Sequence, residues 1–207
     1  MPSSHDFIKD KRNKNIKIYI NGKFFVREKA KISVFDSSIL LGDGIWSGIR
    51  FHNNNFLFLK DHLNRLFDDA KKISLKIQLT KKQISKILFD TIKINKMKTD
   101  VHLRLIISRG IKSTPYQDPV FTISKPTIII IPEYKQPQES IYKKGLVLKT
   151  VKTIRGPHNV QDPRINSLSK LNCILACIEA KKQKADEALM FDIKGNIATN
   201  NSTHFFT

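Results

Sequence analysis

The sequence has few cysteines and no long apolar run. Its 207 residues include only two cysteines, Cys173 and Cys177. Neither has a histidine at metal-ligand spacing, so we expect reduced packing thiols and no metal site. No apolar run approaches the ~18 residues that a membrane-spanning helix requires. Residues 1–15 are polar and lack the apolar core of a signal peptide. These absences predict a cytoplasmic protein with no membrane segment.

Acidic residues are also scarce. The chain has 18 of them against 37 lysines and arginines, a formal net charge of +19. Such an excess of positive charge raises nucleic acid as a partner. The lysines are spread through the chain, however, with no arginine-rich block and no nucleic-acid motif. We therefore interpret the charge as solvated surface lysines and keep a basic nucleic-acid-binding domain as the less favoured alternative.

Strand and helix patterns cover most of the first 131 residues. Two alternating runs, 16–20 and 23–26, flank Asn21-Gly22, which predicts a β-hairpin. Apolar residues at helical spacing predict a helix from residue 59 to residue 73. Thr80 and Gln83 form a capping box at the start of a further helix. The chain then alternates over 101–107, which predicts a strand.

These patterns predict an α+β fold of two domains. Residues 132–141 are polar, contain two prolines and show no periodicity, which is typical of an interdomain linker. The expected organisation is a disordered N-terminus over 1–15, a small α+β domain over 16–131, the linker over 132–141 and part of a second domain over 142–207.

The stretch from residue 162 to residue 192 organises the second domain. Pro163 and several capping side chains precede apolar residues at helical spacing, which predicts an amphipathic helix that begins near residue 167. Its expected core stripe contains Leu171, Ile174, Leu175 and Ile178. Residues 188–191 then read as a strand that enters a glycine turn.

This stretch resembles the second domain of the class IV aminotransferases, which use pyridoxal phosphate. The resemblance rests on the order DPRI, S-L, L-N, ADEALMFD and N-S-T-x-F-F. Upstream, DHLNRLFDDAKKI is similar to the family pattern H-x-x-R-L-x-x-S-A-K. The resemblance implies a class IV aminotransferase-like fold with an incomplete second domain. It also implies a homodimer that transfers an amino group between an amino acid and a 2-oxo acid.

The resemblance also assigns roles to individual residues. Arg65 matches the arginine that holds the cofactor phosphate, a task that suits its permanent charge and forked geometry. Trp46, Arg50 and Arg109 fall in segments that line the family's substrate pocket. The residues themselves leave other interpretations open: Arg65 as a solvated helix charge, Trp46 as a core aromatic and Arg109 as an exposed charge at a strand end.

Two cofactor-facing positions depart from the family pattern. Asn166 stands where the motif P-x-I-K-S-L-N has the Schiff-base lysine, and Thr199 stands where a glutamate pairs with the pyridine nitrogen. If residues 166–178 are helical, Lys170 lies on the same face one turn later, ~6 Å along the axis. Lys170 is therefore the candidate for a relocated catalytic lysine. The alternative is a catalytically degenerate relative that binds a small anion or a partner chain.

Overall fold

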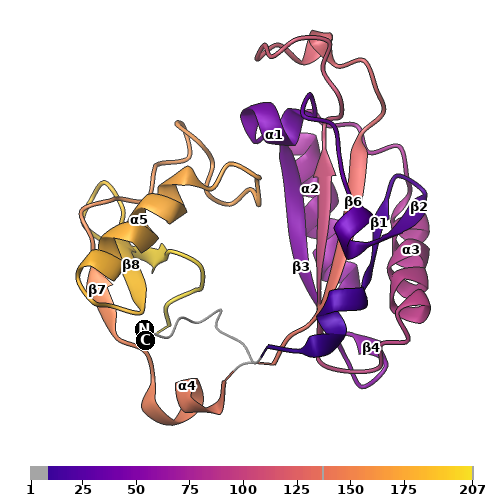
Figure 1. Cartoon of the computed structure of the whole chain (residues 1–207). Coiled ribbons are helices and arrows are strands. Elements are labelled where there is room, and N and C mark those ends of the chain that lie inside the picture. Colours follow the sequence, from indigo (N-terminus) through magenta and orange to yellow (C-terminus); the bar gives the residue numbers. More distant parts are fainter. Residues whose placement is uncertain (1–8, 137, 207) are drawn as a thin grey trace. The chain divides into compact units, whose positions relative to one another are not determined.

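The chain folds into two compact units. The computed structural model describes residues 9–136 and 138–206. The first unit comprises Lys9–Lys135 together with Ile165–Ser169, and the second comprises the described residues of 136–164 and 170–206. Figure 1 colours both units along the sequence. Segment 165–169 therefore belongs to the first unit, although it follows part of the second unit in the chain.

A six-stranded antiparallel sheet forms the centre of the first unit (Figure 1). Its strand order is β2-β1-β6-β5-β3-β4. The strands are β1 (Lys17–Ile20), β2 (Lys23–Val26), β3 (Gly44–His52), β4 (Asn55–Phe56), β5 (Val101–Ser108) and β6 (Thr127–Tyr134). The predicted hairpin between β1 and β2 is confirmed. Asn21 and Gly22 have φ values of 46° and 94°, as a tight two-residue turn requires.

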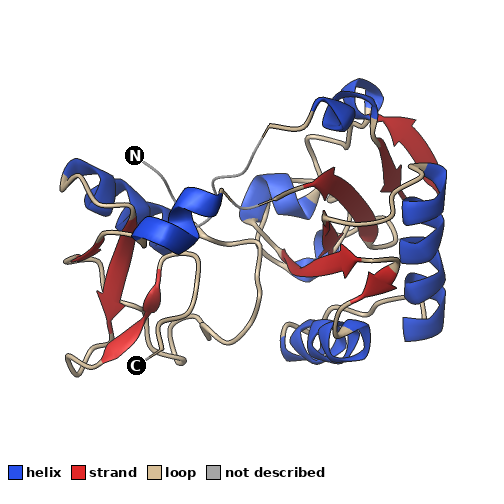
Figure 2. Cartoon of the chain, turned by 90° about the horizontal axis from the view of Figure 1, so that it is seen from below, coloured by secondary structure: helices blue, strands red, loops and turns tan. Residues whose placement is uncertain are grey.

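Two helices pack on one face of this sheet. α2 (Leu59–Lys72) packs on β3, and α3 (Lys81–Ile94) packs on β1 and β6. Figure 2 shows these helices in blue beside the red strands. The predicted capping box is present, since Thr80 and Gln83 bond to each other's backbone N–H. The core between helices and sheet includes Leu63, Leu66, Ile84, Leu88, Val101, Leu103, Leu105 and Ile107.

Residues 9–15 are structured, in contrast to the disordered segment expected over 1–15. They contain the 3-10 helix η1 (Lys11–Asn15). The side chain of Asn13 is buried, donating to the Tyr134 carbonyl at 2.8 Å and accepting from the Tyr134 N–H at 2.8 Å. These long-range bonds hold a polar segment whose composition alone predicted disorder. Residues 1–8 lie outside the described residues.

Short elements complete the first unit. They are η2 (Arg27–Lys29), α1 (Ser37–Leu41) and η3 (Pro119–Phe121). The Asp36 side chain caps α1, and Gly42 ends it with a φ of 65°. The expected linker over 132–141 overlaps regular structure at both ends, because β6 continues to Tyr134 and a helix begins at Glu139.

The second unit contains a three-stranded sheet and two helices. Its elements are α4 (Glu139–Lys144), β7 (Leu148–Thr150), α5 (Leu171–Lys182), β8 (Glu187–Phe191) and β9 (Ile197–Asn200). β7 and β8 pair in parallel, and β9 pairs with β8 in the antiparallel sense. No helix in the described part of the chain has the length and apolar character to cross a membrane.

The predicted start and core face of α5 were wrong. The helix begins at Leu171, about four residues after the expected position. The expected core stripe is exposed: Leu171, Ile174, Leu175 and Ile178 have exposed fractions of 64%, 52%, 47% and 48%. Ala176 and Ala180 on the opposite face are fully buried and pack with Val151 and Met190. The face with small side chains is the buried one because alanine lets the helix approach the sheet closely.

Candidate functional site

Segment 165–169 extends the edge of the first unit's sheet where β3 begins. Ser167 forms an antiparallel bridge with Ile45, and the Leu168 N–H donates to the Gly44 carbonyl at 2.9 Å. A Cβ atom on Gly44 would lie 2.7 Å from Leu168 Cδ1 and 2.7 Å from a backbone oxygen of β5. Glycine at this position therefore allows the segment to close over the strand.

Both backbone groups of Asn166 are held. Its carbonyl accepts from the Trp46 N–H at 2.9 Å, and its N–H donates to Asp69 Oδ2 at 3.1 Å. Asp69 lies on α2 and is 1% exposed. Its other carboxylate oxygen, Oδ1, has no hydrogen-bond donor among the described residues, and Lys72 Nζ lies 3.7 Å from it. The position that replaces the family lysine is thus joined to a buried carboxylate.

The side chain of Asn166 lies on the open face of the sheet. Directly opposed residues of an antiparallel pair point to the same side, and neighbours along a strand alternate. Ser167 opposes Ile45, which points into the core, so Asn166 shares the other face with Trp46. On that face the guanidinium of Arg104 lies 4.0 Å from the centre of the Trp46 ring. Position 166 therefore lies beside an aromatic ring that carries a cation.

The Arg104 guanidinium is partly shielded from water. Its loss of solvent lowers its pKa, an effect that attraction to Glu133 opposes. Arg104 is exposed overall, and at an exposed site stacking on an aromatic face stabilises a cation by about 0.5–1 kcal/mol. The sequence resemblance assigned no role to Arg104. Strand alternation supplies the missing signal, because the apolar partners Leu103 and Leu105 turn Arg104 to the open face.

A row of polar side chains follows α2 toward the same segment. His62, Arg65 and Asp69 lie at three- and four-residue spacing, which places them on neighbouring turns of one helix face. Ser47 Oγ lies 3.2 Å from His62 Nδ1. Burial lowers the pKa of His62, and the positive charge of Arg65 lowers it further. Arg65 is exposed and forms no ion pair within the described residues, so its charge faces solvent.

Arg109 is part of the fold and does not face an open site. It binds both carboxylate oxygens of Asp43, and its remaining donors reach the carbonyls of Ile73 and Ser74. Its side chain is 14% exposed. Neither the substrate-binding role nor the exposed strand-end charge expected for Arg109 agrees with this geometry. A carboxylate distant in sequence fills the guanidinium fork.

Arg50 is likewise engaged, at the other end of β3. Its Nη1 donates to the Lys135 carbonyl at 2.6 Å, and its Nη2 lies 3.4 Å from Asp100 Oδ1. Trp46 lies on the open face, with the Arg104 guanidinium over its ring. The structure thus brings together Trp46, Arg104 and position 166, whereas the guanidinium of Arg50 is bonded within the fold.

The geometry that supported Lys170 is absent. Residues 166–170 are not helical, and Lys170 is the N-cap of α5 with a φ of −117°. The 100° steps that placed Lys170 on the face of Asn166 therefore do not apply. Lys170 also belongs to the second unit, whereas Asn166 belongs to the first.

Thr199 lies on β9 in the second unit. Its hydroxyl donates to the Thr203 carbonyl at 3.0 Å. It lines a cavity of about 910 Å³ whose charged and imidazole-bearing lining residues are Arg155, His158, Asp162, Arg164, Asp192, Lys194 and His204. Arg155 itself is bonded to Asn172, Cys173 and the Pro163 carbonyl. Thr199 brings no carboxylate to this cavity.

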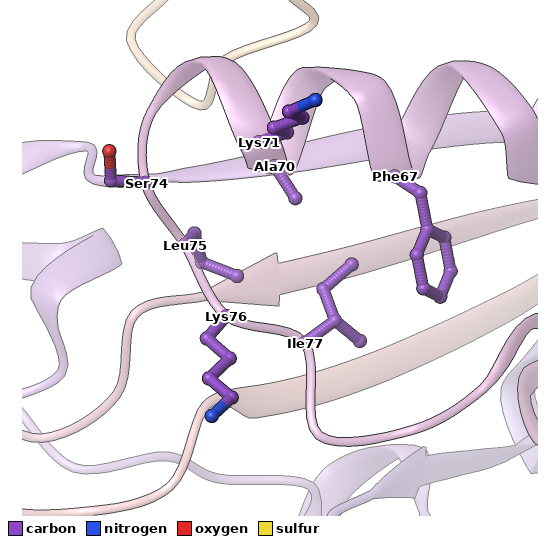
Figure 3. Close-up of a pocket in the computed structure, with 7 residues that line it drawn as sticks. All are labelled: Phe67, Ala70, Lys71, Ser74, Leu75, Lys76 and Ile77. Atoms are coloured by element: carbon purple, nitrogen blue, oxygen red, sulfur yellow. The ribbon is translucent and has the colours of Figure 1, made fainter.

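A smaller hollow lies at the end of α2 (Figure 3). It measures about 350 Å³ and is lined by Phe67, Ala70, Lys71, Ser74, Leu75, Lys76 and Ile77. Figure 3 shows the apolar side chains turned toward its centre and the amine of Lys76 turned outward. The lining has no carboxylate or imidazole, so the hollow offers no acid–base chemistry. Among the described residues, no group of three or more potential ligands forms a metal site.

Comparisons with known proteins agree with the resemblance. The sequence model of the family described as Amino-transferase class IV matches residues 44–206. A Methanocaldococcus jannaschii protein, provisionally named a branched-chain-amino-acid aminotransferase, is 36% identical over 92% of this chain. The branched-chain aminotransferase of Thermoproteus uzoniensis, solved with norvaline, superposes with a TM-score of 0.79 at 25% identity over 90% of this chain. The expected α+β class IV aminotransferase fold is thereby confirmed.

A third comparison supports the fold alone. The branched-chain amino acid aminotransferase of Thermobaculum terrenum, solved in its holo-form, superposes with a TM-score of 0.74 at 21% identity over 91% of this chain. The chain spans 65% of the Methanocaldococcus protein and 63% and 62% of the two solved chains.

Proposed function

Because the chain belongs to the class IV aminotransferase family, we propose that it is an aminotransferase-like protein that binds pyridoxal phosphate. Its reaction class would be the transfer of an amino group between an amino acid and a 2-oxo acid. The names of its relatives support this reaction class. When bound, the cofactor supplies an electron sink for the carbon that carries the amino group.

Arg65 is the observation that carries the proposal. Its guanidinium is exposed, free of carboxylate partners in the described residues, and located on α2 one turn before Asp69. A phosphate accepts two parallel hydrogen bonds from such a fork. Arg65 therefore fits the phosphate of the cofactor, in agreement with the helix motif that first indicated it.

Arg104 is our candidate for the substrate carboxylate. It stacks on Trp46 on the face that also carries the Asn166 side chain. A partly desolvated guanidinium binds a carboxylate more strongly than a fully hydrated one. We therefore favour Arg104 over Arg50 and Arg109 as the residue that binds the substrate carboxylate, because the donors of the other two are already bonded within the fold.

Two positions do not fit the cofactor. Asn166 has no amine for covalent attachment, and the Thr199 hydroxyl cannot pair ionically with a protonated pyridine nitrogen. These positions favour a second candidate function, in which a catalytically silent member of the family binds the cofactor or another small anion without a covalent bond. The two candidates differ in whether this chain transfers an amino group without the lysine amine that the family attaches to its cofactor at position 166.

We further propose a homodimer in the cytoplasm. The support is the family resemblance and the polar sequence. Sedimentation of the purified protein at micromolar concentration measures the oligomeric state, and a monomer at every concentration would contradict the dimer.

A titration with pyridoxal phosphate tests the proposal. We expect saturable binding that weakens about ten- to a hundredfold in Arg65→Ala, because a charge-assisted hydrogen bond is lost. Lys60→Ala, which removes an exposed cation from the same helix, serves as the matched control. Equal affinities for the parent and Arg65→Ala would sink the assignment. Amino-group transfer to a 2-oxo acid separates the active candidate from the silent one.

A further inference from the structure

Lys135, directly after β6, belongs to a cluster of charged side chains on the open face of the first unit's sheet. We propose that its amine reacts with the carbonyl group of a 2-oxo acid to form an imine, and that Arg104 holds the carboxylate of that acid. This lysine is separate from position 166, where the family attaches its cofactor. The inference rests on the proposed function only in using Arg104 as the carboxylate anchor.

The backbone of Lys135 is held on both sides. Its N–H donates to the Asp100 carbonyl at 2.7 Å, which continues the ladder between β5 and β6 one residue beyond Tyr134. Its own carbonyl accepts from Arg50 Nη1 at 2.6 Å. Arg50 Nη2 in turn lies 3.4 Å from Asp100 Oδ1. The side chain of Lys135 therefore starts from a fixed position at the end of the strand.

Strand register places the charged side chains on one face. Arg50 is opposite His102, and His102 is opposite Glu133, so these three form a row across β3, β5 and β6. Directly opposed residues point to the same side, and so do residues two apart along a strand. Arg104 follows His102 by two residues, and Lys135 follows Glu133 by two. Both therefore share the open face with this row.

The surroundings of Lys135 favour the neutral form of its amine. Burial is the main cause that lowers the pKa of Lys135; attraction to Glu133 opposes it, and repulsion by Arg104 and Arg50 adds to it. An amine must be neutral to attack a carbonyl group, and proteins activate lysines by shielding them from water beside other cations. Lys135 has both features, since it is half-buried and lies near two guanidinium groups.

The cluster carries more cations than carboxylates. Its charged and titratable groups, besides Lys135, are Arg50 and His52 on β3, Asp100, His102 and Arg104 at β5, Glu133 on β6, and Arg27 after β2. Both carboxylates lie close to other groups: Asp100 Oδ1 is 3.2 Å from His52 Nδ1, and Glu133 Oε1 is 3.6 Å from Arg27 Nη1. The remaining positive charge attracts an anionic carbonyl compound.

The proposed step is a condensation. The lone pair of Lys135 Nζ attacks the carbonyl carbon, a C=N bond replaces the C=O bond, and the two amine protons leave with the oxygen as water. The step consumes no oxidant or reductant. A guanidinium binds a carboxylate through two parallel hydrogen bonds, so Arg104 can hold the acid while the amine attacks the neighbouring carbon.

Reductive labelling with glyoxylate, the smallest 2-oxo acid, tests the reactivity of Lys135. Cyanoborohydride delivers a hydride to the imine and leaves a stable carboxymethyl group on the amine. Peptide mass mapping over time and over a range of pH compares Lys135 with Lys125, an exposed lysine that precedes β6. We expect Lys135 to be labelled first and at lower pH, with loss of this fast labelling in Lys135→Gln. Labelling of Lys135 no faster than that of Lys125 would overturn the proposal.

Removal of the Glu133 charge tests the activation of the amine. Glu133→Gln should speed the labelling of Lys135 and move its pH profile to lower pH, because the attraction that favours the ammonium is gone. Glu28→Gln, which removes an exposed carboxylate next to Arg27, is the matched control and should leave the profile unchanged. An unchanged profile in Glu133→Gln would overturn the electrostatic activation.

Acetaldehyde, which has no carboxylate, tests the anchor. The ratio of glyoxylate to acetaldehyde labelling at Lys135 should fall about tenfold in Arg104→Gln, because a charge-assisted hydrogen bond to the carboxylate is lost. The ratio cancels any change in the amine itself, and amide exchange at Leu105, in the centre of the sheet, reports whether each variant is folded. An unchanged ratio would overturn the role of Arg104. Neither reagent is pyridoxal phosphate, so these outcomes are independent of cofactor binding through Arg65.

Discussion

Asp43 and Arg109 form a two-point ion pair at the end of β3 and β5. Nε lies 2.6 Å from Oδ2, and Nη2 lies 3.0 Å from Oδ1. The two residues are 66 positions apart in the chain. The side chains of Arg109 and Asp43 are only 14% and 21% exposed. A partly buried guanidinium needs its carboxylate partner, because water cannot fully solvate the charge if the carboxylate is removed.

Asp43→Ala should therefore destabilise the first unit by about 2–3 kcal/mol, since it leaves the Arg109 charge partly buried without a partner. The fluorescence of Trp46, the single tryptophan, reports denaturant unfolding of this unit. Asp90→Ala, which breaks an exposed pair with Lys86, should cost less than about 1 kcal/mol. Equal losses in the two variants would show that Asp43 contributes no more than a surface charge.

Gly44→Ala should loosen the 165–169 segment. A Cβ atom there would lie 2.7 Å from a backbone oxygen of Ile107 and 2.7 Å from Leu168 Cδ1, so both contacts must lengthen. We expect a loss of about 1–3 kcal/mol, typical of overpacking, together with faster amide exchange at Leu168. Gly156→Ala is the control, because a Cβ atom on Gly156 meets nothing within 4 Å. Unchanged protection of Leu168 in Gly44→Ala would contradict the close approach.

The two faces of α5 should respond in opposite ways to substitution. Leu175→Ala removes a side chain that is 47% exposed, so it should cost less than about 1 kcal/mol. Ala176→Leu adds volume at a fully buried position and should cost about 1–3 kcal/mol. Amide exchange along β8 measures the stability of the second unit in both variants. A larger loss of stability in Leu175→Ala than in Ala176→Leu would show that the face of Leu175 is the buried one, as the sequence pattern suggested.

The stability of the first unit should depend on pH through His62. Burial lowers the pKa of His62 first, and Arg65 lowers it second. The unfolded chain therefore binds this proton more tightly than the folded chain does. The contribution of His62 to stability is complete above the ordinary histidine pKa, about 6.5, and is lost as the pH falls from there through the lower pKa of His62 in the folded chain.

Denaturant unfolding at a series of pH values should thus show stability falling below about pH 6.5, with a shallower slope in His62→Gln. NMR titration in Arg65→Ala should show the pKa of His62 raised toward its ordinary value, because a nearby positive charge is gone. An unchanged His62 pKa in Arg65→Ala would contradict the effect of the Arg65 charge on His62.

Local sequence determined the elements whose stabilising contacts lie within a few residues. Asn21-Gly22 specifies its hairpin because both residues adopt positive φ readily. The Thr80–Gln83 capping box marks the start of α3 because both partners lie within one turn. Family motifs likewise identified Arg65 and the replaced positions 166 and 199, since residue types can be compared without knowing their surroundings.

Contacts between distant residues decided the rest. Apolar residues occur on both faces of α5, so their spacing alone does not determine which face is buried. Packing against the second unit's sheet buries the face of Ala176 and Ala180. Arg109 meets its carboxylate across 66 positions, and Asn166 meets Asp69 across 97. Periodicity carries no record of such pairs, because a hydrogen bond between separate elements depends on how the chain returns to itself. The partner of position 166 was therefore visible only once segment 165–169 had been placed on the edge of β3.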